Sequence, residues 1–233
     1  MKSKTVKLLS LGITDFYDIW NLQKEIFSLR KENQIEDVLI LTEHNSVYTI
    51  GKNGSETHLL ANESELKIDG INTYNIDRGG DITFHGIGQI VGYPILNLEN
   101  YYLDIHKYLR DIEEVIILTL KYFDIQGKKD SDFTGVWVEG NKIAAIGIKV
   151  KSWITMHGFA LNVNTNLNHF EKIIPCGIFH KGVTSIEKVL NKKINLSEVQ
   201  KKLVENFSRV FNVKIEEIKE EFIGRLNNKL QLT

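Results

Sequence analysis

The chain has 233 residues, of which 42% are hydrophobic and 25% are charged, and its formal net charge at pH 7 is −1. These values are ordinary for a globular protein, and a nearly neutral chain has no overall attraction to nucleic acid or to anionic membranes. The single cysteine, Cys176, excludes an internal disulfide and a cysteine-based zinc cluster. The N-terminal residues carry no apolar run typical of a secretory signal, and no stretch would span a bilayer. We therefore expect a cytoplasmic protein with no nucleic-acid or membrane partner.

The first hundred residues predict one helix among several short strands. An apolar strand is expected at residues 5–11, and hydrophobic side chains at helical spacing then predict an amphipathic helix from Phe16 to about Asn33. Apolar, β-branched runs predict further strands at residues 38–42, 47–50, 72–76 and 89–98. Pro94 lies in the last of these runs and indicates an edge or bulge position, because proline cannot donate to a sheet ladder.

The rest of the chain predicts two more helices and a hairpin. The helices are expected at residues 105–123 and from about Ser197, where Ser197 and Gln200 have capping-box spacing. The hairpin has strands at residues 135–139 and 142–150, a turn at Gly140-Asn141, and a following strand at residues 154–163.

This irregular order of helices and strands is unlike a doubly wound parallel fold. We predict a single α/β (α+β) catalytic domain over residues 1–233, with a mixed β-sheet, helices packed on one side of it, and a C-terminal helical extension at about 195–233.

A glycine-rich segment, Arg78-Gly79-Gly80-Asp81-Ile82-Thr83-Phe84-His85-Gly86-Ile87-Gly88-Gln89, lies between two of the predicted strands. Glycine costs conformational entropy, so a dense cluster suggests that the backbone is held close to something. The polar residues between the glycines supply hydrogen-bond donors and a titratable ring, which a specific site needs. The segment is therefore the first candidate for a functional site.

Cys176 is the main candidate for nucleophilic chemistry. Free cysteines are most often buried and inert, but this one lies between Pro175 and Gly177, outside any apolar periodicity. A thiol of pKa about 8.5 needs a neighbouring base or cation to form the reactive thiolate. The candidates for that neighbour are His85, His157, His180 and Lys142. Lys142 is either a solvated strand end or an amine whose pKa is lowered by desolvation.

Three other kinds of site fit the sequence less well. Gly86-Ile87-Gly88 with Gly92 resembles a dinucleotide-binding loop, but the third glycine is misplaced and no helix follows. There is no Walker-type loop to indicate ATP binding. The histidines and Cys176 lack the spacing of metal ligands, so we expect neither a metal nor a cofactor.

Four segments, in order along the chain, resemble those of the lipoyl(octanoyl) transferase family, the octanoyl-[acyl-carrier-protein]–protein N-octanoyltransferases. They are EHNSVYTIG at 43–51, RGGDITFHGIGQ at 78–89, GNKIAAIG at 140–147, and HGFALNV at 157–163 leading to Pro175-Cys176-Gly177. The resemblance covers about residues 35–190, and the ordered set is far more specific than any single piece.

The resemblance implies a fold similar to the catalytic domain of biotin and lipoate protein ligases. It implies an acyltransferase that moves an octanoyl group from octanoyl-acyl carrier protein to a lysine of lipoyl domains, the first step of endogenous protein lipoylation. The acceptors would belong to 2-oxoacid dehydrogenase complexes and the glycine cleavage system. The transfer would pass through a cysteine thioester with no cofactor, and we expect a monomer.

By matching position, the resemblance makes Cys176 the acyl-accepting nucleophile and Lys142 its partner. The residues that would surround the acyl chain and its carbonyl are Arg78, Gly79, Gly80, Asp81, Ile82, Thr83, Phe84, His85, Ala145, Ile146, Gly147, Gly158, Phe159 and Ala160.

Two positions depart from the family pattern. Ile87 replaces the usual proline, which leaves the loop less rigid, and Phe84 replaces a tyrosine that is often present. Three alternatives stay open: an ATP-dependent lipoate–protein ligase, an octanoyl amidotransferase of the same fold, and a binding module for acyl carriers or lipoyl domains without catalytic activity.

Overall fold

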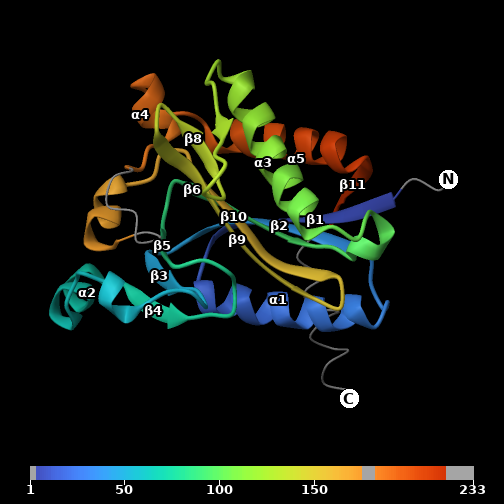
Figure 1. Cartoon of the computed structure of the whole chain (residues 1–233), viewed down its shortest axis with the longest axis horizontal. Helices are drawn as coiled ribbons and strands as arrows, with labels where there is room; N and C mark the ends of the chain where they lie inside the picture. The colour runs from blue at the N-terminus through green and yellow to red at the C-terminus, as the bar shows by residue number, and fades with distance from the viewer. Residues whose placement is uncertain (1–3, 175–181, 219–233) are drawn as a thin grey trace.

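The computed structural model describes residues 4–174 and 182–218. Its main element is an eight-stranded mixed sheet in the order β11-β1-β2-β6-β10-β9-β8-β7 (Figure 1). The strands are β1 (Lys4–Thr14), β2 (Asp37–His44), β6 (Gln89–Ile95), β7 (Lys128–Lys129), β8 (Val136–Val138), β9 (Asn141–Lys151), β10 (Ile154–Asn162) and β11 (Val213–Glu217). Strand β1 is parallel to both of its neighbours, whereas the other pairings are antiparallel.

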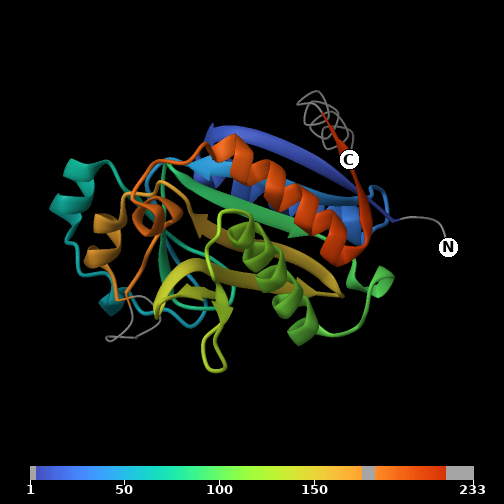
Figure 2. The same ribbon diagram turned by 90° about the horizontal axis from the view of Figure 1, so that it is seen from above.

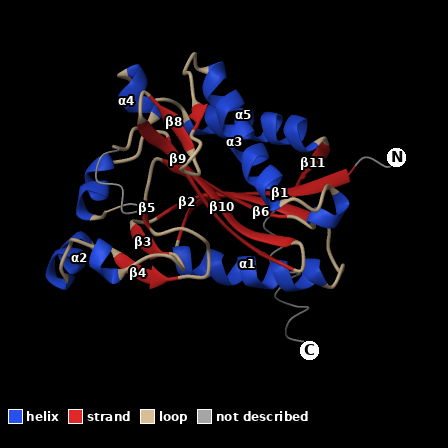
Figure 3. Cartoon of the chain, viewed as in Figure 1, coloured by secondary structure: helices blue, strands red, loops and turns tan. Residues whose placement is uncertain are grey.

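A second, three-stranded sheet lies at one end of the main sheet (Figure 3). It has the order β4-β3-β5, formed by β4 (Asn72–Asn75), β3 (Val47–Ile50) and β5 (Ile82–His85). The small helix α2 (Glu63–Asp69) precedes β4 and begins at the capping box formed by Asn62 and Glu65. Strand β5 belongs to the glycine-rich segment, and the next strand in the chain, β6, belongs to the main sheet. The segment therefore connects the two sheets.

Helices cover both faces of the main sheet, not one side as the sequence predicted. Helix α1 (Phe16–Lys31) packs on one face, and α3 (Ile105–Tyr122) with α5 (Leu196–Phe211) packs on the other (Figures 1 and 2). Strand β2 shows why, because its central residues are all apolar and adjacent side chains in a strand point to opposite faces. Leu39 and Leu41 join the core cluster with α3 and α5, whereas Val38 and Ile40 join the cluster with α1.

Pro94 does not lie on an edge strand, because β6 is between β2 and β10. The last regular pair of β6 and β10 before Pro94 is Gly92–Phe159. No residue of β10 therefore requires a hydrogen bond from the backbone nitrogen of Pro94, which carries no hydrogen. Its carbonyl instead accepts a hydrogen bond from the Thr155 hydroxyl at 2.7 Å. Proline is tolerated here because the pairing of β6 with β10 is interrupted between the Gly92–Phe159 pair and the Asn97–Ile154 bridge.

The predicted hairpin is present, but its turn is one residue earlier than expected. Val138 pairs with Asn141, so the two-residue loop is Glu139-Gly140, with φ of 49° and 80°. Two consecutive positive φ values are typical of the tight turns that match the twist of a hairpin.

The C-terminal region is not purely helical. Helix α5 begins after the cap residue Asn195, not at Ser197, and strand β11 follows it. Strand β11 pairs with β1 from Lys4–Val213 to Leu8–Glu217. Within the expected helical extension, the described residues therefore complete the main sheet. Among all the residues that the structure describes, no helix has the length and hydropathy needed to cross a membrane.

Candidate active site

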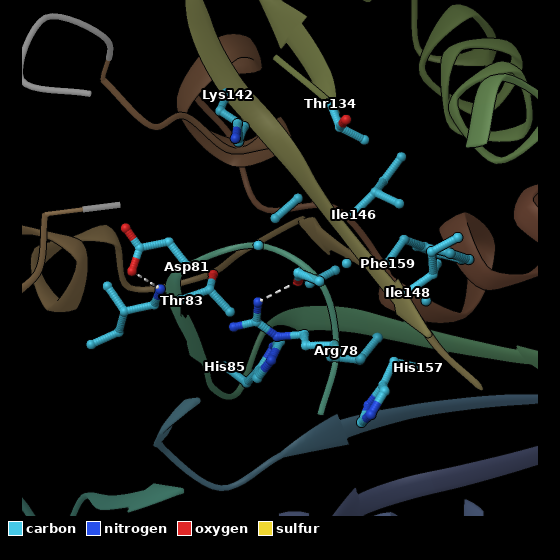
Figure 4. Close-up of a pocket in the computed structure, with 18 of the residues that line it drawn as sticks. Arg78, Asp81, Thr83, His85, Thr134, Lys142, Ile146, Ile148, His157 and Phe159 are labelled. Carbon is cyan, nitrogen blue, oxygen red and sulfur yellow. Dashed lines mark hydrogen bonds between the residues drawn. The ribbon is translucent and has the colours of Figure 1, made fainter. Parts of the chain in front are cut away.

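A cavity of about 370 Å³ lies beside β9, where the glycine-rich segment, β6, β10 and α3 come together (Figure 4). The predicted site residues that line it are Arg78, Gly79, Gly80, Asp81, Ile82, Thr83, His85, Lys142, Ala145, Ile146, Gly147, Gly158, Phe159 and Ala160. The structure thus brings together three segments that are far apart in the sequence. Cys176 and His180 lie outside the described residues.

Phe84 is the predicted substrate-binding residue that does not line the cavity. Adjacent residues in a strand point to opposite faces, so Thr83 and His85 direct their side chains toward the cavity while Phe84 points away. Its ring packs against Tyr48 and Phe170 in a separate buried cluster. Phe84 therefore supports the wall of the site from behind.

Glycines on the strands that face the segment let the backbone of the segment cross them at close range. The Gly79 N–H donates to the Ile148 carbonyl at 2.8 Å, so the loop crosses β9 directly. A Cβ atom at Gly147 would lie 2.9 Å from the Gly79 carbonyl oxygen, and one at Gly51 would lie 2.3 Å from that of Gly80. Gly51 and Gly147 are therefore required where the backbone of the segment passes closest to β3 and β9.

Arg78 fixes this loop from within. Its guanidinium is buried, and Nη2 donates to the Thr49 carbonyl at 2.7 Å and to the Thr49 hydroxyl at 3.0 Å. The Arg78 carbonyl accepts from the Lys52 N–H at 2.9 Å. These bonds join the loop to β3 and set its position over the cavity.

His85 is held as a neutral ring. Its Nδ1–H donates to Gln89 Oε1 at 2.8 Å, and Gln89 Nε2 donates in turn to Asn162 Oδ1 at 2.9 Å. Burial, reinforced by the charges of His44 and Arg78, lowers the pKa of His85 to about 3. A ring with this pKa is a weak base, so the geometry suits orientation of the site better than proton transfer.

A polar network closes the end of the cavity near the β9–β10 hairpin. His157 Nε2 lies 2.8 Å from Asp77 Oδ1, and the other Asp77 oxygen accepts from the Lys149 ammonium. Hydrogen bonding to His157 and Lys149 holds the pKa of Asp77 well below its usual range, whereas burial lowers the pKa of His157. His157 has a φ of 59°, so its backbone departs from the regular strand conformation at the residue that contacts Asp77.

Lys142 owes its orientation to a β-bulge. Val136 pairs with Ala144 and Trp137 with Lys142, so Ile143 is the extra residue in β9. Ile143 and Ala144 both face the core with α3, which leaves Lys142 on the opposite face with Ala145. The Lys142 ammonium lies 4.8 Å from the centre of the Trp137 ring.

A buried carboxylate supports the segment beside Lys142. Glu113 of α3 is fully buried and accepts from the Gly135 N–H at 3.1 Å and from Arg110 at 2.8 Å. Gly135 has a φ of 129°, and a Cβ there would lie 2.6 Å from the Ala144 carbonyl oxygen and 3.5 Å from Cε of Lys142. Glu113 thus holds a glycine that packs against the lysine side chain.

The cavity extends around both sides of β9. Figure 4 shows Lys142 on one side of the strand and Thr134 and Ile146 on the other. This is possible because the ladder with β8 ends at Ala144 and, among the described residues, no other strand pairs with that side of β9. One branch therefore faces α1 and contains the small residues, and a second branch faces α3.

Sequence reasoning did not identify several lining residues as part of the site. These are Phe16, Asn53, Ile76, Val91, Tyr93, Leu109, Asp132, Phe133, Thr134, Ile148, Asn162, Phe170 and Val183. The Asp-Phe-Thr-Gly run at 132–135 carried the only local signal, since it has turn residues directly before a predicted strand. The others reach the cavity through tertiary contacts.

The sequence of this chain is similar to those of known proteins. The family model described as the lipoyl protein ligase A/B catalytic domain matches residues 15–208. An octanoyltransferase of Christiangramia forsetii is 46% identical over 230 residues, which cover 91% of this chain and 98% of the relative. The chain belongs to the octanoyltransferase family. An octanoyltransferase of Rubrobacter xylanophilus is 47% identical over 201 residues, 85% of this chain and 90% of its own. The family resemblance of the sequence is confirmed.

The fold of this octanoyltransferase family member is shared with ligases. A crystal structure of lipoate-protein ligase A bound with ATP has a TM-score of 0.76 at 15% identity, covering 98% of this chain and 94% of that one. A biotin protein ligase of Aquifex aeolicus has a TM-score of 0.50 at 12% identity, covering 91% and 70%. At such identities the likeness concerns the fold alone, and it confirms the predicted fold class.

Proposed function

We propose that this protein is an octanoyltransferase that moves an octanoyl group from octanoyl-acyl carrier protein to a lysine of lipoyl domains. The observation that carries the proposal is the similarity to octanoyltransferases that are 43–47% identical to this chain and cover 85–92% of it. Lipoyl domains of 2-oxoacid dehydrogenase complexes and of the glycine cleavage system are the proposed acceptors.

In the proposed mechanism, the Cys176 thiolate attacks the thioester carbonyl of the donor. A new carbon–sulfur bond forms, the old one breaks, and the carrier thiol leaves with a proton. The lysine amine of the acceptor then attacks the acyl-enzyme, releases Cys176 and loses a proton as the amide forms. Exchange of one thioester for another is nearly balanced, so the enzyme needs a thiolate and a well-held carbonyl.

Lys142 is the proposed partner of Cys176 in both steps. An ammonium near the sulfur would stabilise the thiolate, and the same group would move protons during attack by the acceptor amine. Its position supports this role, because the bulge at Ile143 directs it to the same face as Ala145 and Gly147. We propose that main-chain N–H groups of the glycine-rich segment bind the developing oxyanion; that of Gly79 does not take part, because it donates to the Ile148 carbonyl.

The acyl chain is proposed to occupy the branch of the cavity that faces α1. Ala145, Gly147, Gly158 and Ala160 leave space there, and Val91 and Tyr93 of β6 add apolar surface. Slots for apolar ligands are lined in this way, with few polar groups. His85 and Arg78 are proposed to fix the loop over the chain without exchanging protons.

Two enzymes of the same fold are alternatives. An ATP-dependent lipoate–protein ligase is less supported. The sequence identity of this chain is 15% to the solved lipoate-protein ligase A and 12% to the solved Aquifex biotin protein ligase. An octanoyl amidotransferase would also use Cys176 but would take its octanoyl group from the lysine of another protein. The two alternatives differ from the proposal in the donor that they need.

The test supplies each donor separately. The purified protein is incubated with octanoyl-acyl carrier protein without nucleotide, and its intact mass is measured before and after a lipoyl domain is added. We expect one octanoyl adduct on Cys176 that disappears as the lipoyl domain gains the same mass. Cys176→Ser should abolish the transfer. Transfer that requires ATP, or transfer only from an octanoylated lipoyl domain, would contradict the proposal.

A further inference from the structure

The branch of the cavity that faces α3 has no role in the mechanism above. We call it the α3-side groove and define it by Leu109, Phe133, Thr134, Ile146 and Ile148, which line the cavity together. Ile146 and Ile148 alternate with the residues on the acyl side of β9 and pack toward the core with α3. The groove is therefore continuous with the surroundings of Lys142 but lies across the strand from the proposed acyl slot.

The floor of the groove exposes main-chain hydrogen-bonding groups. The Ile148 carbonyl accepts from Gly79, so it points away from β10. Main-chain groups two residues apart in a strand point to the same side, so the N–H and carbonyl of Ile146 also point outward. Within residues 4–174 and 182–218, no strand pairs with β9 on that side beyond Ala144. An extended ligand with amide groups can therefore bond to Ile146.

One wall of the groove is apolar, and the other is a loop that carries Phe133 together with the polar residues Asp132 and Thr134. Leu109 of α3 is half-buried and stands outside the core cluster that the helix forms with the sheet. The opposite wall is the 132–134 loop, where Asp130 Oδ1 accepts from the N–H groups of Asp132 at 2.9 Å and Phe133 at 3.1 Å. Glu113 secures the end of this loop through the Gly135 N–H. A preformed channel with both apolar and polar lining and a main-chain floor suits a flexible chain that carries apolar groups and amides.

We propose that the α3-side groove binds the pantetheine arm of the acyl donor, an inference that rests on the proposed octanoyltransferase function. The arm is a flexible chain that ends in the thioester sulfur, and its two amides each offer a donor and an acceptor. Its amides would bond to the outward N–H and carbonyl of Ile146, while its methylene and methyl groups lie against Leu109 and Phe133. The thioester then reaches the space beside Lys142 from one side of β9, and the octanoyl chain enters the slot on the other.

The experiment compares two thioesters of the same acid. Octanoyl-pantetheine carries the arm, whereas S-ethyl octanethioate has the same reacting carbonyl and no amide. The rate of acyl-enzyme formation is measured for each by intact mass, and the readout is the ratio of the two kcat/KM values. For the wild-type protein we expect the pantetheine thioester to be favoured about tenfold, the effect of a small number of net hydrogen bonds.

Leu109→Trp fills the groove and should bring this ratio close to one. A substitution that merely slows the chemistry lowers both rates and leaves the ratio unchanged, which separates binding of the arm from a structural defect. The matched control is Ile105→Trp, also on α3 but 39% exposed and outside the cavity lining. The control should keep the wild-type ratio.

The outcomes separate this inference from the function on which it rests. Equal rates from the two thioesters in the wild-type protein would overturn the inference and leave octanoyl transfer intact. A wild-type protein that gains no octanoyl group from either thioester, nor from octanoyl-acyl carrier protein, would overturn both. A Leu109→Trp protein that keeps the ratio but needs more lipoyl domain for the second step would overturn the inference and assign the groove to the acceptor.

Discussion

Gly135 lies beside two of the groups on which the candidate site depends: its N–H donates to the buried carboxylate of Glu113, and a Cβ added to it would lie 3.5 Å from Cε of Lys142. A helix on one face of the sheet thereby restrains a lysine on the other. A substitution at Glu113 is therefore expected to change both the stability of the fold and the activity that depends on Lys142, and the two effects can be measured separately.

Glu113→Ala should destabilise the fold and slow acylation. The substitution leaves the Gly135 N–H buried without an acceptor, which costs about 1–3 kcal/mol of unfolding free energy. Glu113→Gln keeps an oxygen for Gly135 and should recover most of the loss. Urea denaturation of the three proteins checks the order, and equal midpoints for the alanine variant and the wild type would contradict it.

Lys142→Ala should slow both formation of the acyl-enzyme and its aminolysis. Loss of a group that moves protons in the transition state lowers rates by roughly 100-fold or more. The fold should persist, because the side chain is half-buried and lies outside the core clusters. Single-turnover mass spectrometry follows the two steps, with circular dichroism as the control for folding. Unchanged rates in both steps would remove Lys142 from the mechanism.

Gly147→Ala should displace the loop that crosses β9. The added Cβ would lie 2.9 Å from the Gly79 carbonyl oxygen, so backbone must move against backbone. Overpacking of this kind costs about 1–3 kcal/mol, and octanoyl transfer should fall with it. Gly12→Ala is the matched control, since a Cβ there meets no atom within 4 Å. If the two variants have the same stability and activity, the crossing does not constrain the site.

Unfolding free energy should fall as the pH is lowered from about 6.5 toward 4. Burial lowers the pKa of His44 to about 4 and contributes most to lowering that of His85 to about 3. The unfolded chain takes up protons at these rings near pH 6.5 while the folded protein does not, so acid favours the unfolded state. Each ring contributes up to about 1.4 kcal/mol per pH unit in this range.

The contribution of one ring can be isolated by substitution. His44→Gln should flatten the dependence of unfolding free energy on pH between 7 and 5, whereas His106→Gln, which alters an exposed ring at the start of α3, should not. Urea titrations at the two pH values provide the measurement. A His44→Gln protein with the full wild-type slope would show that this ring titrates alike in both states.

Local patterns in the sequence were sufficient to predict those helices and strands that are formed mainly by interactions between residues close in the sequence. The amphipathic helix from Phe16 and the strands around the glycine-rich segment follow from periodicity, and that segment does line the cavity. The turn at Ser152-Trp153 gave no such signal, because both residues adopt positive φ without a glycine or asparagine. Tertiary packing overrode the local preference there.

Other features of the site arise from long-range pairing and have no local signature. In the sequence, Glu113 cannot be distinguished from other acidic residues of an amphipathic helix. Its role follows only from the fold, which brings the Gly135 N–H within hydrogen-bonding distance of its carboxylate. Asp77 and His157 are 80 positions apart and meet only because the glycine-rich loop crosses β9. The bulge at Ile143 is equally hidden, since a run of small and apolar residues does not reveal which of them lacks a partner.

The pairing of β11 with β1 has a consequence for any shortened form of the chain. A protein that ends before Val213 would lose the strand that covers β1 and would expose a row of unsatisfied main-chain groups along Lys4–Leu8. Such an uncovered margin is a template for recruiting a second molecule, and self-association or aggregation would follow. The last described strand therefore guards against self-association, at the opposite side of the sheet from β9, which borders the cavity.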